Sequence, residues 1–143
     1  MDYPIDTRLA LISLGYTDEH FDVACNTQGC TIERWDHLDP KPTPEQVAAW
    51  EPQWKAEQAV KDINAEAYAR IVAIAPEYMQ RNMTARGLEI TQKLVAGDAL
   101  TQDEIDERDA IQAVWDQVKA IRAAANTMTS DPLTYADPAN RVW

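Results

Sequence analysis

The first hydrophobic pattern in the chain predicts a short amphipathic helix over residues 6–14. Leu9 and Ile12 fall on one side of such a helix, and Leu11 adds to the same apolar face. Gly15 is the type of residue that ends helices, because it adopts the left-handed conformation at little cost. We therefore expect a helix of about two turns at the start of the chain.

A β-hairpin is predicted next. Apolar residues alternate with polar or small ones over residues 21–25 and again over residues 30–35. The four residues between these runs, 26–29, include a glycine, as hairpin turns often do. Because an isolated hairpin is marginal in water, we expect it to pack on the first helix.

A long helix is predicted after a proline-rich link over residues 38–43. Thr43 is a suitable N-cap, Pro44 occupies the tolerated first position, and Gln46 completes a capping box. Pro52 is expected to kink or restart this helix, and Pro76 to end it. Its apolar positions recur three or four residues apart: Val47, Trp50, Trp54, Val60, Ile63, Ala67, Ile71 and Ile74.

Two further helices are predicted on the C-terminal side of Pro76. One runs to Gly97, and the other starts at a second capping box that begins with Thr101. Because the link between them is short, we expect an antiparallel pair and hence a helical hairpin or a three-helix bundle. The apolar stripes are Met79, Met83, Gly87, Ile90 and Leu94, and then Ile111, Val114, Val118, Ile121 and Ala125.

The last segment, residues 127–143, has a different pattern. Its two Asp-Pro pairs oppose a continuing helix, which predicts an extended arm with apolar anchors at intervals. Such an arm either folds back on its own bundle or docks on a partner. The anchors that we select as partner-binding residues are Leu133, Tyr135, Val142 and Trp143.

These elements predict a mainly α fold in three parts. Residues 1–39 form a head of one helix and a hairpin, residues 40–126 form the helical body, and residues 127–143 form the arm. A chain of 143 residues has room for one modest core. We see no internal repeat.

The charge of the chain narrows its range of partners. The net charge is −11, and no basic stripe interrupts the acidity. Such a chain repels phosphate backbones and anionic membranes, so we expect neither nucleic acid nor membrane as a partner. It has no apolar run of about 18 residues and no N-terminal secretory pattern, which predicts a soluble protein made in a cytoplasm.

Cys25 and Cys30 flank the predicted turn and leave three alternatives open. Two reduced cysteines that pack as small apolar side chains are the interpretation that a cytoplasmic origin favours. A disulfide across the hairpin is the second, because opposed residues lie within reach of one another. Zinc binding with His20 and His37 is the third, although the ligand spacing departs from that of zinc knuckles.

Catalytic chemistry has no candidate residues. Both histidines lie in the predicted head, and the sequence lacks the motifs of hydrolases, nucleotide-binding enzymes and zinc proteases. We therefore expect no catalysis and no cofactor. An acidic cluster at the start of the last helix matches the positive end of the helix dipole and is interpreted as a solvated face. It comprises Asp103, Glu104, Asp106, Glu107 and Asp109.

Five tryptophans are many for a narrow helical body. Most are expected in the core, but two or three helices cannot bury every aromatic side chain. Exposed aromatic anchors are typical of protein-binding surfaces. Trp35, at the end of the hairpin, joins the anchors of the arm as a partner-binding candidate.

The order of these parts resembles small tail-associated proteins of bacteriophages, notably the XkdW-like proteins of phage-like elements. The resemblance rests on the short helix, the hairpin that ends in Ile-Glu-Arg-Trp at residues 32–35, and the proline-rich link into residues 42–46. Residues 100–104, followed by Trp115 and Arg122, are also similar to the C-terminal helix of phage tail-fibre assembly proteins. The resemblance covers residues 7–54 and 100–126.

This resemblance implies a non-enzymatic role in a phage virion, reached after synthesis in the host cytoplasm. A structural adaptor would join a tail or baseplate component to a fibre. Its partners would be other tail or fibre proteins, with a homo-oligomer as a further option. A tail-fibre assembly chaperone that leaves the mature particle is the first alternative. A small acidic regulatory or inhibitor protein, with or without zinc, is an alternative from another class.

Overall fold

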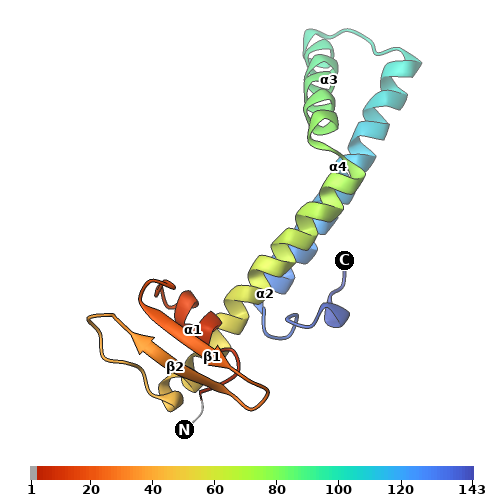
Figure 1. The fold of residues 1–143 in the computed structure, drawn as a ribbon. Helices are drawn as coiled ribbons and strands as arrows, with labels where there is room; N and C mark the ends of the chain where they lie inside the picture. Colours follow the sequence, from red (N-terminus) through yellow and green to blue (C-terminus); the bar gives the residue numbers. More distant parts are fainter. Residues whose placement is uncertain (1–2) are drawn as a thin grey trace.

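The computed structural model of the protein describes residues 3–143, and its fold is mainly α, as predicted. A head of one short helix and a hairpin lies at one end of a rod made of two long antiparallel helices (Figure 1). A third long helix lies at the far end of the rod. The elements are α1 (Thr7–Ser13), β1 (Phe21–Cys25), β2 (Cys30–Trp35), α2 (Pro44–Ile74), α3 (Glu77–Ala96), α4 (Gln102–Ser130) and the 3-10 turn η1 (Pro138–Asn140).

The hairpin has the strand limits that the alternating pattern predicts. Its register places Phe21 opposite Trp35 and Cys25 opposite Cys30, with a bulge between Asp22 and Val23. The head core forms where α1, the hairpin and the start of α2 meet. Its buried residues are Tyr3, Ala10, Leu11, Phe21, Cys30, Ile32 and Val47.

Helix α1 buries only one of the three residues of its predicted apolar face. Leu11, with Ala10, is fully enclosed, whereas Leu9 and Ile12 are exposed. Leucine or isoleucine occupies four of the six positions from 9 to 14, so periodicity alone does not single out one side of so short a helix. The contact of α1 with α2 decides the buried side.

Helix α2 begins as predicted. The Thr43 side chain accepts a hydrogen bond from the Gln46 backbone, and the Gln46 side chain accepts one from the Thr43 backbone, which completes the capping box. Pro44 lies in the first turn. The helix then continues through Pro52 to Ile74, so the predicted restart is absent. Packing of Trp50 and Trp54 on the head core stabilises both sides of the proline.

Both ends of α3 and the start of α4 also lie at predicted signals. Gly97 ends α3 with a φ of 85°, and Thr101 caps α4 in a second capping box. The three long helices pack together, but α4 lies mainly along α2, and α3 contacts only the far part of α4 (Figure 1). The predicted pairing of α3 with α4 is therefore a smaller interface than that of α2 with α4.

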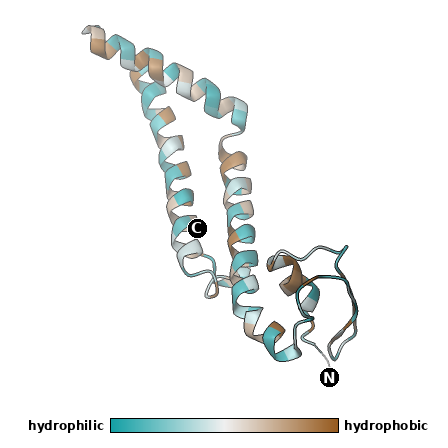
Figure 2. Ribbon diagram, turned by 90° about the vertical axis from the view of Figure 1, so that its left-hand side faces the viewer, coloured by the Kyte–Doolittle hydropathy of each residue, from teal (hydrophilic) through white to brown (hydrophobic). Residues whose placement is uncertain are grey.

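Two buried clusters hold the rod. The middle of the rod contains Ile63, Ala67, Ile121, Ala125 and Met128, and the far end contains Ala75, Met83 and Val118. Hydrophobic and hydrophilic residues alternate along every long helix, as expected where each buries one side only (Figure 2).

The C-terminal segment folds back along the rod. Helix α4 extends to Ser130, past the predicted start of the arm at residue 127. Turns and η1 then carry the chain back along α2, where Tyr135 and Trp143 pack on the middle cluster. Of the two predicted fates of this arm, the structure therefore has the intramolecular one.

Candidate functional site

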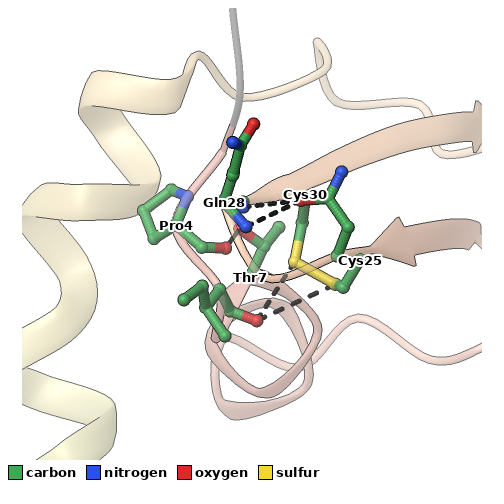
Figure 3. Close-up of a disulfide and its surroundings, with 8 residues drawn as sticks. Pro4, Thr7, Cys25, Gln28 and Cys30 are labelled. Atoms are coloured by element: carbon green, nitrogen blue, oxygen red, sulfur yellow. Dashed lines mark hydrogen bonds between the residues drawn. A yellow bond between two sulfur atoms is a disulfide. The ribbon is translucent and has the colours of Figure 1, made fainter.

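The two cysteines form a disulfide across the hairpin, so the favoured prediction of reduced thiols is wrong (Figure 3). The register places Cys25 and Cys30 directly opposite each other, with their Cα atoms 4.0 Å apart. The N-terminal segment lies beside this bond, since Tyr3 exchanges backbone hydrogen bonds of 2.7 and 2.8 Å with Cys30. The disulfide thus stabilises the point where the hairpin and the N-terminal segment meet.

The zinc alternative is wrong for a geometric reason. His20 and His37 lie close together, with ring centroids 4.9 Å apart, but they flank the open end of the hairpin. The cysteines lie at its turn, and their sulfur atoms are bonded to each other. Within residues 3–143, no group of three or more metal-binding side chains is present.

The acidic cluster at the start of α4 has a structural role. The buried carboxylate of Glu104 accepts hydrogen bonds from Lys93 at 2.5 Å and from the Thr101 backbone at 3.0 Å. These two contacts, led by the one with Lys93, lower the pKa of Glu104. Glu107 accepts a hydrogen bond from Arg86 at 2.8 Å. Both carboxylates therefore join α4 to α3.

Three of the five predicted partner-binding residues make contacts within the chain. Trp35 packs on the head core, and its Nε1 donates to the Asp39 carbonyl at 2.7 Å. Tyr135 and Trp143 pack on the middle cluster. Leu133 and Val142 are exposed. Partner binding by these five residues stays a prediction.

An ion-pair network holds the C-terminal segment to α2. Arg141 donates from Nη1 to Oε2 of Glu66 at 2.9 Å, and Glu66 also accepts from Arg70. The guanidinium of Arg70 lies over the Trp143 ring, 4.8 Å from its centroid. The hydrogen bond from Arg141 has the largest effect on the pKa of Glu66 and lowers it. Burial opposes this effect, and the hydrogen bond from Arg70 adds to it.

Exposed apolar side chains that the sequence analysis did not select concentrate near the two ends of the rod. The pattern assigned Leu9, Ile12, Met79 and Leu94 to buried stripes, so it gave no sign of their exposure. The head carries Ile5, Leu9, Ile12 and Leu38, and the far end carries Tyr78, Met79, Leu88, Leu94 and Val95.

The apolar surface of the head borders a hollow between α1 and α2. Leu9, Ile12 and Trp54 line this hollow, whose volume is about 180 Å³. Ser13 donates a hydrogen bond to Glu57 across it and ties α1 to α2. The hollow can receive an apolar side chain of a partner, because its walls are held in place by the chain itself.

A larger groove lies between α3 and α4 at the far end. Its volume is about 480 Å³, and its apolar lining includes Met83, Ile90, Leu94, Ile111 and Trp115. Its polar lining comes from both helices, with Thr84 and Thr91 on α3 and Arg108 and Gln112 on α4. Each end of the rod therefore combines exposed apolar residues with a concave site.

No helix within residues 3–143 is long and apolar enough to cross a bilayer. Comparison of the chain with known protein families, with curated proteins and with solved structures finds no match in any of the three.

Proposed function

We propose that this chain is a non-enzymatic structural adaptor that joins a phage tail or baseplate component to a fibre. The observation that carries the proposal is the separation of two apolar binding surfaces by a rod. The head surface around Leu9 and Ile12 and the far-end surface on α3 lie at opposite ends of the α2–α4 pair (Figure 1). A protein that holds two different neighbours needs this arrangement.

The central part of the rod supports the same proposal. Its buried cluster around Ile63 joins α2 to α4, and neighbouring charges such as Glu66 and Arg70 are paired within the chain. Exposed apolar area is worth roughly 25 cal/mol per Å² when a partner covers it. Within residues 3–143, nine of the twelve large exposed apolar side chains lie at the ends, and the other three are Tyr68, Leu133 and Val142. The ends therefore have more to gain from partners than the middle.

The resemblance of residues 7–54 and 100–126 to phage tail-associated proteins supplies the biological setting of this proposal. The first of these segments contains α1, the hairpin and the start of α2, and the second contains most of α4. Both segments contribute to the rod and its head, and neither includes α3.

A tail-fibre assembly chaperone is the second candidate. The folded-back C-terminal segment favours it, because this segment packs on its own chain and does not reach along another subunit as the arm of an adaptor would. A chaperone needs one binding surface and leaves the mature particle. An inhibitor that imitates nucleic acid has less support, because basic residues are interspersed with the acidic ones on every long helix.

Mass spectrometry of purified virions tests the adaptor directly. The adaptor is expected in mature particles at a fixed copy number relative to the tail proteins. Absence from mature particles, together with presence in assembly intermediates, would replace the adaptor with the chaperone.

Variants of the head surface test which end makes contact. Leu9→Glu with Ile12→Glu is expected to leave the circular dichroism spectrum unchanged and to prevent incorporation into particles. Ala65→Glu with Ala69→Glu places the same two charges on exposed positions of α2 and is the matched control. Normal incorporation of the head variant would exclude that surface as a binding site.

A further inference from the structure

One side of α3, at the edge of the groove between α3 and α4, carries a regular row of exposed residues. Thr84, Leu88, Thr91 and Val95 follow one another at spacings of four, three and four, which places them on one side of the helix. Leu88 is 58% exposed and Val95 is 84% exposed. The two threonine hydroxyls donate to carbonyl groups of α3 itself, at 2.8 Å each. The hydroxyl hydrogens of the row are therefore already bonded within α3, and a partner that covers the row does not leave them without an acceptor.

Gly87 lies beside this row, at the mouth of the groove between α3 and α4. Glycine destabilises the middle of a helix relative to alanine. Apart from the two adjacent residues and the neighbouring backbone of α3 itself, no heavy atom of residues 3–143 lies within 4 Å of the place where a Cβ atom of residue 87 would be. Contacts inside the chain therefore do not account for the missing side chain, whereas the close approach of a second helix would.

Ion pairs join α3 to α4 on another side of α3. Arg86 contacts Glu107 at 2.8 Å and Lys93 contacts Glu104 at 2.5 Å, so charged contacts join α3 to α4 there. The apolar row and Gly87 lie away from these pairs. The side of α3 that carries the row is thus free of these ion pairs, and it exposes the apolar side chains of Leu88 and Val95 beside polar ones such as Gln92.

Charge indicates what covers this side. Helix α3 has three basic and two acidic residues, whereas α2 has three basic and five acidic residues and α4 has three basic and six acidic residues. In a chain with a net charge of −11, α3 is the long helix on which two copies meet with the least repulsion. A strongly basic partner would instead be drawn to α4.

We propose that α3 packs antiparallel against α3 of a second copy of this chain, about a two-fold axis. In this antiparallel arrangement each threonine of one row lies opposite an apolar residue of the other row: Leu88 contacts the partner's Thr91, and Thr84 contacts the partner's Val95. The same register brings Arg81 next to the partner's Asp98. Both side chains are exposed, and neither takes part in an ion pair within residues 3–143.

The dimer bears on the proposed function, because it makes a second copy of the chain the neighbour that the far-end surface on α3 holds. Because α3 lies at the end of the rod remote from the head, pairing through α3 leaves both heads free (Figure 1). The dimer then has two identical heads, and this increases its apparent affinity for any partner that presents two sites.

Sedimentation equilibrium of the full oxidised chain tests the dimer. The average mass is expected to rise with concentration from 16.1 kDa toward twice that value. Leu88→Glu is expected to weaken dimerisation at least about tenfold, because two carboxylates would enter an apolar contact. Val95→Glu is expected to act in the same direction. Leu38→Glu, at a fully exposed position of the head, is the matched control and should dimerise normally.

A charge exchange tests the register. Arg81→Asp and Asp98→Arg should each weaken the dimer by placing like charges together, and the double variant should restore it. Three outcomes would overturn the proposal: a monomer at every concentration, a dimer that tolerates both glutamates, or a double variant that is not restored. The first of these would leave the α3 face to a helix of another protein.

Discussion

Arg141 and Glu66, 75 positions apart in the chain, form an ion pair of 2.9 Å that closes the C-terminal segment onto the middle of α2. The Arg141 side chain is only 5% exposed, and its Nε donates to the Tyr135 carbonyl at 3.1 Å. The guanidinium is thus enclosed by the segment that it anchors. This enclosure makes the carboxylate of Glu66 decisive for the position of the last residues.

Replacement of Glu66 by glutamine should detach the C-terminal segment, because it leaves the enclosed guanidinium of Arg141 without a counter-charge. We expect a loss of about 1–2 kcal/mol in the free energy of unfolding, between the values typical of exposed and of buried pairs. Urea unfolding measures this loss. Glu51→Gln, which removes the exposed helical pair with Lys55, should cost a few tenths of a kcal/mol and is the control.

The effect of Glu66 should depend on pH. The pKa of Glu66 is lower in the folded protein than in the unfolded chain, where a glutamate titrates at about 4.3. The stabilisation is therefore fully present above the unfolded pKa and is lost as the pH falls through the folded pKa. Urea unfolding of the wild type and of Glu66→Gln should give different free energies at pH 7 and converging ones below about pH 4. A constant difference across this range would contradict the assignment.

Truncation of Ile63 should be among the most damaging single changes in the rod. Its side chain is fully buried in the middle cluster between α2 and α4. Ile63→Ala is expected to lower the free energy of unfolding by about 2–5 kcal/mol. Leu38→Ala, at a fully exposed position, should change it by less than about 0.5 kcal/mol. Equal effects of the two variants in thermal or urea unfolding would refute this core assignment.

Reduction of the disulfide should destabilise the head only moderately. The bond closes a loop with a sequence separation of 5, and the loop-closure relation gives a stabilisation of about 2 kcal/mol for so short a loop. We expect this loss in urea unfolding with a phosphine reductant, while the helical circular dichroism signal is retained. The double variant Cys25→Ala with Cys30→Ala should not respond to the reductant. Loss of the helical signal on reduction would show that the rod depends on the bond.

Local signals in the sequence predicted the limits of the elements well. Thr43, Gly97 and Thr101 act within one turn of a helix, so their effects can be inferred from neighbouring residues alone. The hairpin has the same locality, because its turn and its alternating strands are contiguous. The mainly α fold follows from these elements.

Contacts between distant residues could not be predicted in the same way. The segment after Ser130 folds back because Arg141 bonds to Glu66 and Trp143 packs on the middle cluster. These contacts join residues far apart in the sequence, so the residues near the segment do not predict them. The disulfide depended on the exact register of the hairpin, and the compartment argument favoured reduced thiols.

The candidate surfaces were hidden for a related reason. Met79 and Leu94 fit a helical stripe that a bundle would bury. They are exposed because α4 lies along α2 for most of its length and leaves α3 with a small interface. Which pair of helices joins is a property of the whole chain, and no single stripe determines it.

The folded-back segment also determines how the molecule would respond to a pulling force. Trp143 rests beside α2, so a load applied there first reaches the contacts of Trp143 and Arg141, one after the other. Contacts loaded in sequence separate at lower force than contacts that share a load. The last residues would therefore separate from the rod before α2 and α4 separate from each other, and the chain would lengthen while the rod remains intact.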